Sequence, residues 1–153
     1  LKQRMLDEKS PFAGEMSGHI FFNDEWFGFD DGAYVGARVL RLLASQAQSI
    51  DALFASLPDS YHTPELKLPM ADNKKSAFMN ALINEGDFGD ARHITIDGLR
   101  VDFGDGWGLV RPSNTSEYLV IRFEADTQER LEVIQGVFRR ELLRIDPGLS
   151  LPF

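Results

Sequence analysis

The stretch from Trp107 to Glu124 reads WGLVRPSNTSEYLVIRFE, and it decides how the second half of the chain folds. It opens with a largely apolar run, Trp107–Val110, and closes with Tyr118–Glu124, in which Leu, Ile and Phe occupy every second position. Alternation of this kind is typical of a β-strand with one buried face. The polar residues 111–116 therefore predict a loop that joins two neighbouring strands.

Residues 59–153 predict one complete domain around this hairpin. A strand at 65–68 precedes a helix capped by Asp72, and residues 93–103 predict a second hairpin with an Asp97-Gly98 turn. Thr127 is expected to cap a last helix. Its buried stripe is Leu131, Ile134, Phe138 and Leu142, whereas Glu129, Glu132 and Glu141 are expected in solvent. The order β-α-β-β-β-β-α favours a four- to five-stranded, mainly antiparallel sheet with two helices on one face.

Residues 1–58 predict only half of an α/β domain, because this segment is too short to close a core of its own. Ser10-Pro11 ends a charged helix, Ile20–Phe22 predicts a strand, and Asp30–Gly32 and Ser49 begin two further helices. Three aromatic residues are expected to pack in the core: Trp26, Phe27 and Phe29. Leu57–Ser60 marks the boundary, so the predicted class is α+β with domains 1–58 and 59–153. The chain begins with Leu1 inside what looks like the last turn of a helix, and we expect a piece of a longer protein.

Composition excludes several classes of function. The 153 residues carry a formal net charge of −8, which disfavours nucleic acid and anionic membranes as partners. There is no cysteine, so neither a disulfide framework nor a thiolate metal site is possible. No apolar stretch approaches the roughly 20 residues of a membrane span, and the first residues lack the apolar core of a signal peptide. We therefore expect a cytoplasmic protein.

The loop at 111–116 offers what a phosphate group needs. Arg111 supplies a planar charged fork, Ser113 and Thr115 supply hydroxyls, and Asn114 supplies an amide. The backbone N–H groups of a tight turn add further donors. The competing interpretation is an ordinary turn with Arg111 in a surface ion pair, which contributes about 0–1 kcal/mol.

A second loop, Gly14–His19, has a different chemistry. Glu15, Ser17 and His19 place a carboxylate, a hydroxyl and an imidazole close to two glycines, and such groups suit the hydroxyls of a sugar. The alternative is structural, with Glu15 and Ser17 capping a glycine turn and His19 supporting the strand that follows. One loop for phosphate and one for sugar together predict an enzyme that acts on sugar phosphates.

Both loops resemble those of a known family. Gly14-Glu15-Met16-Ser17-Gly18-His19 and Arg111-Pro112-Ser113-Asn114-Thr115 are similar to the sugar-binding and phosphate-binding loops of the α-D-phosphohexomutases, in the phosphomannomutase/phosphoglucomutase branch. The resemblance covers nearly the whole chain and includes Trp26–Gly32, Asp97–Asp102 and Leu151–Phe153. It implies that the chain is the latter half of a third domain followed by a fourth domain with a TATA-binding-protein-like fold.

The resemblance also implies an activity. Family enzymes are isomerases that interconvert hexose 1-phosphate and hexose 6-phosphate through a phosphoserine and a hexose 1,6-bisphosphate intermediate. Glu15, Ser17 and His19 would bind the sugar, with His19 also a candidate catalytic residue, and Arg111, Ser113, Asn114 and Thr115 would bind phosphate. The phosphoserine loop and the Mg²⁺ loop have no counterpart here, so this chain alone is expected to be inactive and to need the remaining domains of its parent.

Two other functions stay open. A non-enzymatic module could use the same loops to bind phosphorylated mannose or glucose without any partner domain. A protein-interaction domain of the same fold would instead present a large exposed apolar patch.

Overall fold

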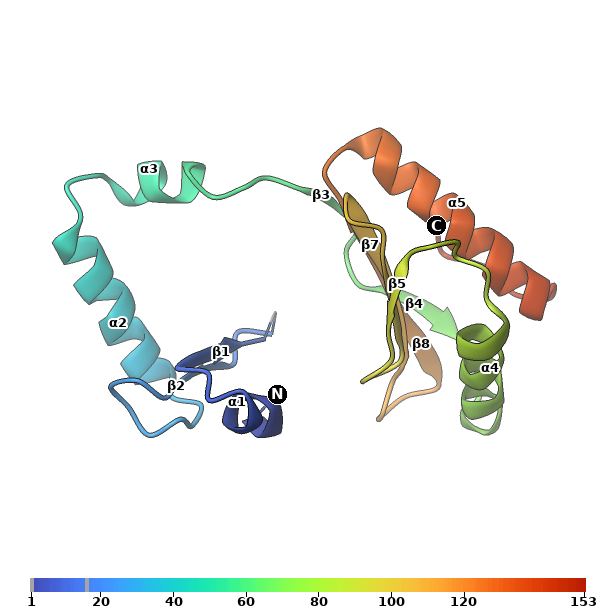
Figure 1. Ribbon diagram of the computed structural model, residues 1–153, viewed down its shortest axis with the longest axis horizontal. Helices are drawn as coiled ribbons and strands as arrows, with labels where there is room; N and C mark the ends of the chain where they lie inside the picture. Colours follow the sequence, from blue (N-terminus) through green and yellow to red (C-terminus); the bar gives the residue numbers. More distant parts are fainter. Residues whose placement is uncertain (1, 16) are drawn as a thin grey trace. The chain divides into compact units, whose positions relative to one another are not determined.

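The computed structural model describes residues 2–15 and 17–153 (Figure 1). The chain divides into two compact units, residues 1–58 and 59–153, which we name the N-terminal unit and the C-terminal unit.

The C-terminal unit is built on a six-stranded antiparallel sheet. Its central hairpin is β7 (Gly106–Pro112) and β8 (Tyr118–Ala125). On one side of the hairpin lie β6 (Leu99–Asp102) and then β5 (Arg92–Ile94), while β3 (Tyr61–His62) and β4 (Leu66–Pro69) both pair with β8. The predicted α+β class and mainly antiparallel sheet are confirmed. Strand β3 was not predicted, because two residues are too few to show alternation.

Two helices, α4 (Asp72–Glu85) and α5 (Gln128–Ile145), cover one face of this sheet (Figure 1). The register places Val110 opposite Ile121 and Gly108 opposite Phe123, so these residues share the covered face. A Cβ on Gly108 would lie 2.3 Å from the Phe138 ring, so glycine leaves the room that this ring needs. The predicted stripe of α5 is buried as expected: Leu131, Ile134, Phe138 and Leu142. Each large apolar side chain buried in this way contributes about 1.5–3 kcal/mol.

The helix caps agree with the sequence at one helix and differ at the other. The Thr127 hydroxyl accepts a hydrogen bond from the N–H of Arg130 (3.1 Å) and caps α5 as predicted. Asp72, in contrast, does not cap α4, because the N-cap position falls on Ala71 and has no side-chain bond. The Asp72 carboxylate instead contacts the Lys75 ammonium at 2.6 Å, one helical turn further on.

The hairpin before β7 has a longer turn than the sequence predicted. Ile94 pairs with Arg100, which is one residue out of register with a two-residue Asp97-Gly98 turn. Gly98 takes φ +88°, a conformation that favours glycine. A Cβ there would also lie 2.4 Å from the Val110 carbonyl oxygen and 2.6 Å from the Cα of Arg111.

Glu141 is the largest departure from expectation. It was predicted to lie in solvent with Glu129 and Glu132, yet its side chain is only 2% exposed. Burial raises the pKa of Glu141, but hydrogen bonds from the Asp87 N–H (3.0 Å), Arg140 (2.8 Å) and Arg144 (3.0 Å) outweigh this and hold the pKa below its ordinary value. The carboxylate therefore ties α5 to the segment that follows α4.

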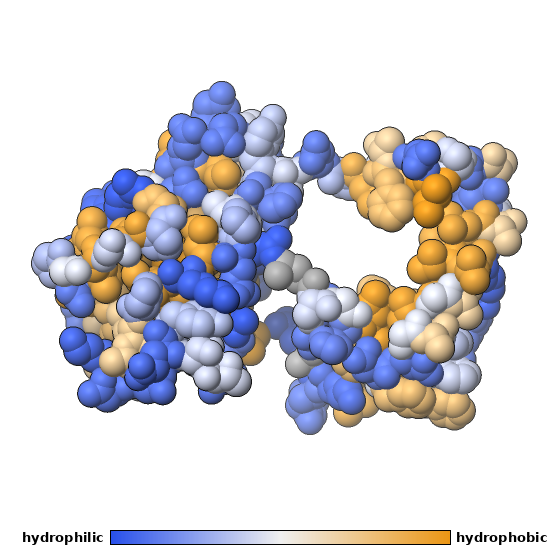
Figure 2. Space-filling model, turned by 180° about the vertical axis from the view of Figure 1, so that it is seen from behind, coloured by the Kyte–Doolittle hydropathy of each residue, from blue (hydrophilic) through white to orange (hydrophobic). Residues whose placement is uncertain are grey.

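The N-terminal unit buries little. Helix α1 (Lys2–Asp7) is followed by a hairpin of β1 (Phe12–Gly14) and β2 (Ile20–Phe22), and then by α2 (Gly32–Ser45) and α3 (Ile50–Ala55). Asp31 and Ser49 cap the last two helices, as expected. Figure 2 shows hydrophobic residues at the surface of this unit. The exposed set includes Val39, Leu40, Leu42, Ile50, Phe54 and Leu57.

Candidate functional site

The loop between β7 and β8 is shorter than predicted, because β7 continues through Arg111 and Pro112. The Ser113 N–H donates to the Tyr118 carbonyl (3.0 Å), and the Tyr118 N–H donates to the Ser116 carbonyl (2.8 Å). Within the loop, the Thr115 N–H lies 3.4 Å from the Ser113 hydroxyl. The four predicted phosphate-binding residues, Arg111, Ser113, Asn114 and Thr115, thus lie in one strand end and the tight turn that follows it.

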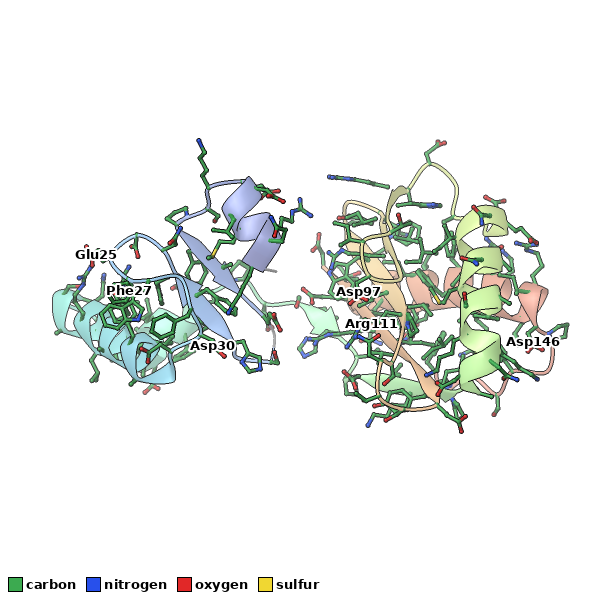
Figure 3. The ribbon with its side chains drawn as sticks, turned by 90° about the horizontal axis from the view of Figure 1, so that it is seen from below. Glu25, Phe27, Asp30, Asp97, Arg111 and Asp146 are labelled. Atoms are coloured by element: carbon green, nitrogen blue, oxygen red, sulfur yellow. The ribbon has the colours of Figure 1, made fainter. Side chains whose placement is uncertain are left out.

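Arg111 lies opposite Val120 on the sheet face that the helices leave uncovered. Its side chain is 33% exposed, and its Nη1 is 3.8 Å from the carboxylate of Asp97, which is itself 67% exposed (Figure 3). An ion pair this long and this exposed contributes little. The guanidinium can therefore exchange Asp97 for a ligand anion at small cost.

The same loop also contains several backbone N–H groups. Among the described residues, no acceptor is hydrogen-bonded to the N–H groups of Asn114, Ser116 and Glu117. Unpaired N–H groups gathered in one turn form a concave site for an anion. Together with Arg111 they offer a phosphate group one charged fork and three neutral donors.

Lys75 of α4, which was not among the predicted site residues, lies beneath this loop. Its side chain is 7% exposed, and its ammonium donates to the carbonyl of Ser113 (3.1 Å) and to that of Ser116. A signal was present, because Lys75 shares a helical face with Phe78, Met79 and Leu82, all of which are buried. A lysine on an apolar stripe indicates a buried cation with specific acceptors.

The second predicted loop joins β1 to β2. The Glu15 N–H donates to the His19 carbonyl (2.9 Å), and the Gly18 N–H donates to the Glu15 carbonyl (2.9 Å). The Ser17 hydroxyl lies 3.2 Å from a carboxylate oxygen of Glu15, so these two side chains are neighbours. Met16 of the motif lies outside the described residues. The three predicted sugar-binding residues, Glu15, Ser17 and His19, therefore belong to one hairpin turn.

His19 pairs with Asp30, a residue that the sequence predicted only as part of a helix start. Its Nδ1 is 2.5 Å from a carboxylate oxygen of Asp30, and a bridge between Phe21 and Asp30 holds the two segments together. A carboxylate on one ring nitrogen orients the imidazole and leaves the other nitrogen for a ligand. Both side chains are well exposed, at 57% and 40%.

The aromatic residues near this loop do not pack as predicted. Trp26 is partly buried and stacks on Tyr34 with 4.3 Å between ring centroids, but Phe27 is 76% exposed and Phe29 is 45% exposed. Their rings stack on each other at 6.2 Å between centroids, and both lie against Trp26, at 4.9 Å for Phe27 and 6.3 Å for Phe29. The expected core is incomplete here, because two of its three rings are left largely in solvent.

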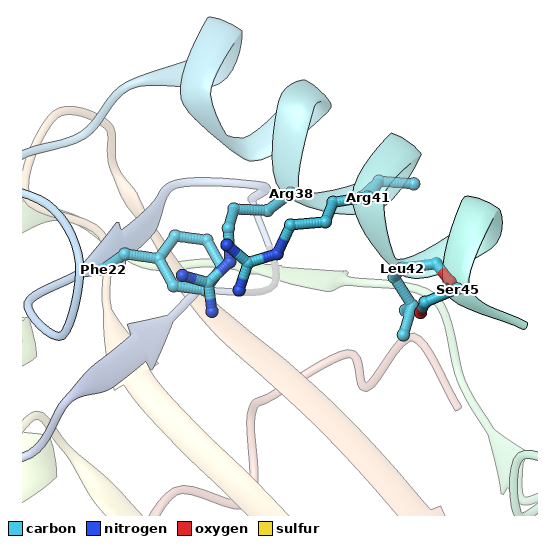
Figure 4. Close-up of a pocket in the computed structure, with 6 residues that line it drawn as sticks. Phe22, Arg38, Arg41, Leu42 and Ser45 are labelled. Atoms are coloured by element: carbon cyan, nitrogen blue, oxygen red, sulfur yellow. Dashed lines mark hydrogen bonds between the residues drawn. The ribbon is translucent and has the colours of Figure 1, made fainter.

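A pocket of about 380 Å³ also lies in the N-terminal unit (Figure 4). Arg38 borders it, but its guanidinium already pairs with Asp24 (3.0 Å) and Glu25 (3.1 Å) and lies 4.4 Å from the Phe22 ring centroid. A backbone hydrogen bond from Glu25, followed by the bond from Arg38, holds the pKa of Asp24 below its ordinary value. The satisfied Arg38 is therefore a structural residue and not a free anion-binding group.

Within residues 2–15 and 17–153, no three His, Asp or Glu side chains gather closely enough to hold a metal ion. No helix in the same ranges is long and apolar enough to cross a membrane.

Comparison with known proteins gives matches along the whole chain. Residues 65–141 match the C-terminal domain of phosphoglucomutase/phosphomannomutase, and residues 1–61 match its alpha/beta/alpha domain III. The phosphomannomutase/phosphoglucomutase of Pseudomonas putida is 49% identical over 153 residues, which are 100% of this chain and 33% of that protein. The phosphoglucomutase of Neisseria meningitidis serogroup A is 45% identical over 99% of this chain and 33% of its own length.

A solved structure agrees. The crystal structure of a phosphoglucomutase/phosphomannomutase family protein from Burkholderia thailandensis matches with a TM-score of 0.89 and 46% identity, over 99% of this chain and 32% of that one. The chain thus spans about one third of the length of the relatives it matches. By its two domain matches and its close relatives, this chain belongs to the phosphoglucomutase/phosphomannomutase family.

Proposed function

We propose that this chain is the C-terminal portion of a phosphomannomutase/phosphoglucomutase that interconverts hexose 1-phosphate and hexose 6-phosphate. The observation that carries the proposal is the β7–β8 loop, where a weakly paired Arg111 lies beside three backbone N–H groups that have no acceptor within residues 2–15 and 17–153. Relatives that carry these two enzyme names support the reaction class.

In this proposal the β7–β8 loop anchors the phosphate group that is not being transferred. Arg111 provides the bidentate charged contact, and Ser113, Asn114 and Thr115 add neutral donors. A fixed anchor is needed because the reaction moves a phosphoryl group at the other end of the sugar, and correct placement lowers the entropic cost of the reaction.

The β1–β2 turn would recognise the sugar. Glu15 accepts hydrogen bonds from two hydroxyls, Ser17 contributes a third contact, and His19, oriented by Asp30, contacts the sugar or assists proton transfer. Charge-assisted bonds of this kind contribute about 1.5–3 kcal/mol each. The bisphosphorylated intermediate must bind in two orientations, so contacts to the equatorial 3- and 4-hydroxyls suit the task because they tolerate reversal.

The phosphoryl donor and the metal lie elsewhere in this proposal. A serine of another domain would donate and recover the phosphoryl group, and Mg²⁺ would bind there as well. On this view the present chain binds and orients substrate, and it does not catalyse the interconversion alone.

Titration of the isotope-labelled chain with mannose 1-phosphate, followed by amide NMR shifts, tests the phosphate anchor. We expect shifts confined to residues 111–117, with a Kd near 1 mM, or about −4 kcal/mol. Mannose itself should produce none of them. Arg111→Ala should weaken binding by about tenfold or more, whereas Arg92→Ala, an exposed arginine on β5, should leave it unchanged.

Absence of loop shifts up to tens of millimolar would mean that this chain does not bind phosphate alone. The same Arg111→Ala change in the full-length parent would then decide, with an expected loss in kcat/KM of about 10²-fold or more. An unchanged kcat/KM would overturn the assignment of Arg111. Micromolar binding by this chain alone, with an inactive parent, would favour the non-enzymatic module.

A further inference from the structure

We propose that Lys75 is the positioning residue of the phosphate loop. The inference rests on the proposed function and extends it to a helix that touches the loop only from below. Lys75 turns the backbone N–H groups of the loop toward the ligand, and it does so by holding the carbonyl oxygens on the opposite side.

Each N–H donor of the Lys75 ammonium has an oxygen acceptor within reach. A protonated lysine has three N–H donors. Three oxygens lie within reach: the Ser113 carbonyl (3.1 Å), the Ser116 carbonyl and an Asp72 carboxylate oxygen (2.6 Å). Since the side chain is 7% exposed, water has little access to compete for these bonds. The ammonium therefore joins two points of the loop, three residues apart, to the first turn of α4.

Fixing the direction of these carbonyl groups also fixes the direction of the N–H groups that follow them in the chain. In a trans peptide the C=O of one residue and the N–H of the next point in opposite directions. When Lys75 holds the carbonyls of Ser113 and Ser116, the N–H groups of Asn114 and Glu117 must point away from α4. These are two of the three N–H groups in the loop that have no acceptor among the described residues.

The charge of Lys75 suits the same role. A buried cation is costly unless its surroundings are well arranged, and an apolar residue of similar volume often serves a core equally well. Phe78, Met79 and Leu82 on the same face of α4 show that an apolar residue would fit the pattern. A lysine here places a cation behind an anion site, in a region where water screens it little, and the Asp72 carboxylate at 2.6 Å offsets part of its charge.

The test compares Lys75→Met with Lys74→Met in the full 153-residue chain. Lys74 is exposed on the same helical turn, so its change removes an equal charge without touching the loop. Ligand-free amide spectra, thermal unfolding and titration with mannose 1-phosphate are recorded for both. We expect Lys75→Met to shift the Asn114 and Glu117 amides before any ligand is added, and to weaken binding by about tenfold. Lys74→Met should do neither.

The outcomes are separable. Binding by the wild type but equal affinity in Lys75→Met, or unshifted Asn114 and Glu117 amides, would overturn the role of Lys75 and leave the phosphate site intact. No binding by the wild type would mean that this chain does not bind phosphate alone; the affinity comparison would then be made in the full-length parent, and the ligand-free amides of this chain would still show whether Lys75 holds the loop. If Lys75→Met fails to fold, Lys75→Gln, which retains a neutral donor, gives the same comparison; wild-type affinity in that variant would show that geometry suffices without the charge.

Discussion

The two units show what the same local signals achieve with and without a complementary surface. Helix α2 of the N-terminal unit and helix α5 of the C-terminal unit are both amphipathic, and each has a side-chain cap, from Asp31 and Thr127. Yet α2 buries no residue, whereas Ile134 and Phe138 of α5 are fully buried. An apolar stripe therefore predicts that a helix has an inner face, but not which segment covers it.

Separating the two units should give the largest difference between them in folding stability. Residues 59–153 alone are expected to unfold cooperatively, with a free energy of unfolding of about 5–10 kcal/mol, because their core is closed. Residues 1–58 alone should show no cooperative transition, since Met5 and Phe21 are the only hydrophobic residues buried in the described part of that unit. Thermal denaturation followed by circular dichroism of both pieces measures this. A sharp transition in residues 1–58 would contradict it.

A matched pair of substitutions repeats the comparison at single residues. Phe138→Ala should lower the free energy of unfolding by about 3–5 kcal/mol, because the ring is fully buried. Phe54→Ala should change it by less than about 0.5 kcal/mol, because that ring is 65% exposed. Urea denaturation of the full chain measures the free energy of unfolding of both variants. A large effect of Phe54→Ala would mean that the exposed apolar face has a partner in solution.

Glu141→Gln probes the buried carboxylate of the C-terminal unit. We expect a loss of about 2–4 kcal/mol near neutral pH, because the Asp87 N–H and two guanidinium groups lose a charged acceptor. The folded-state pKa of Glu141 is lowered, so its stabilisation is fully present above the ordinary value of 4.5 and is lost as the pH falls through the folded-state pKa. Denaturation of both proteins across pH should show the difference between them shrinking only in acid. A difference that grows in acid would rule this out.

Gly98→Ala should lower stability less than Phe138→Ala or Glu141→Gln, yet it reaches the candidate site. The positive φ of Gly98 and its contact with the backbone of Arg111 predict a cost of about 1–3 kcal/mol. Because the new methyl group would displace Arg111, binding of mannose 1-phosphate should weaken as well. Gly104→Ala is the matched control, since Gly104 has a similar φ of +90° but open space around it. Equal phosphate affinity in both variants would argue against the contact.

Periodicity and capping chemistry predicted the parts of the fold that depend on neighbours in sequence. The stripe of α5, the cap at Thr127 and the β7–β8 hairpin are of this kind. The buried ionic residues escaped prediction, because their partners lie far along the chain: Ser113 is 38 residues from Lys75, and Asp87 is 54 residues from Glu141. The loops of the candidate site were found from their side-chain chemistry and family resemblance, and the roles of their residues stay predictions.

The extension of β7 through Arg111 has a consequence for the energetics of recognition. Val110, immediately before it, is fully buried, and Leu119 and Ile121 flank its cross-strand partner from within the core. The backbone of Arg111 is therefore immobilised when the C-terminal unit folds. The backbone conformational entropy of Arg111 is therefore lost on folding and not on binding. Only side-chain rotamers remain to be fixed when a ligand binds, at a cost of about 0.5–1.5 kcal/mol for each immobilised side chain. An incoming anion thus meets an anchor that is already preorganised.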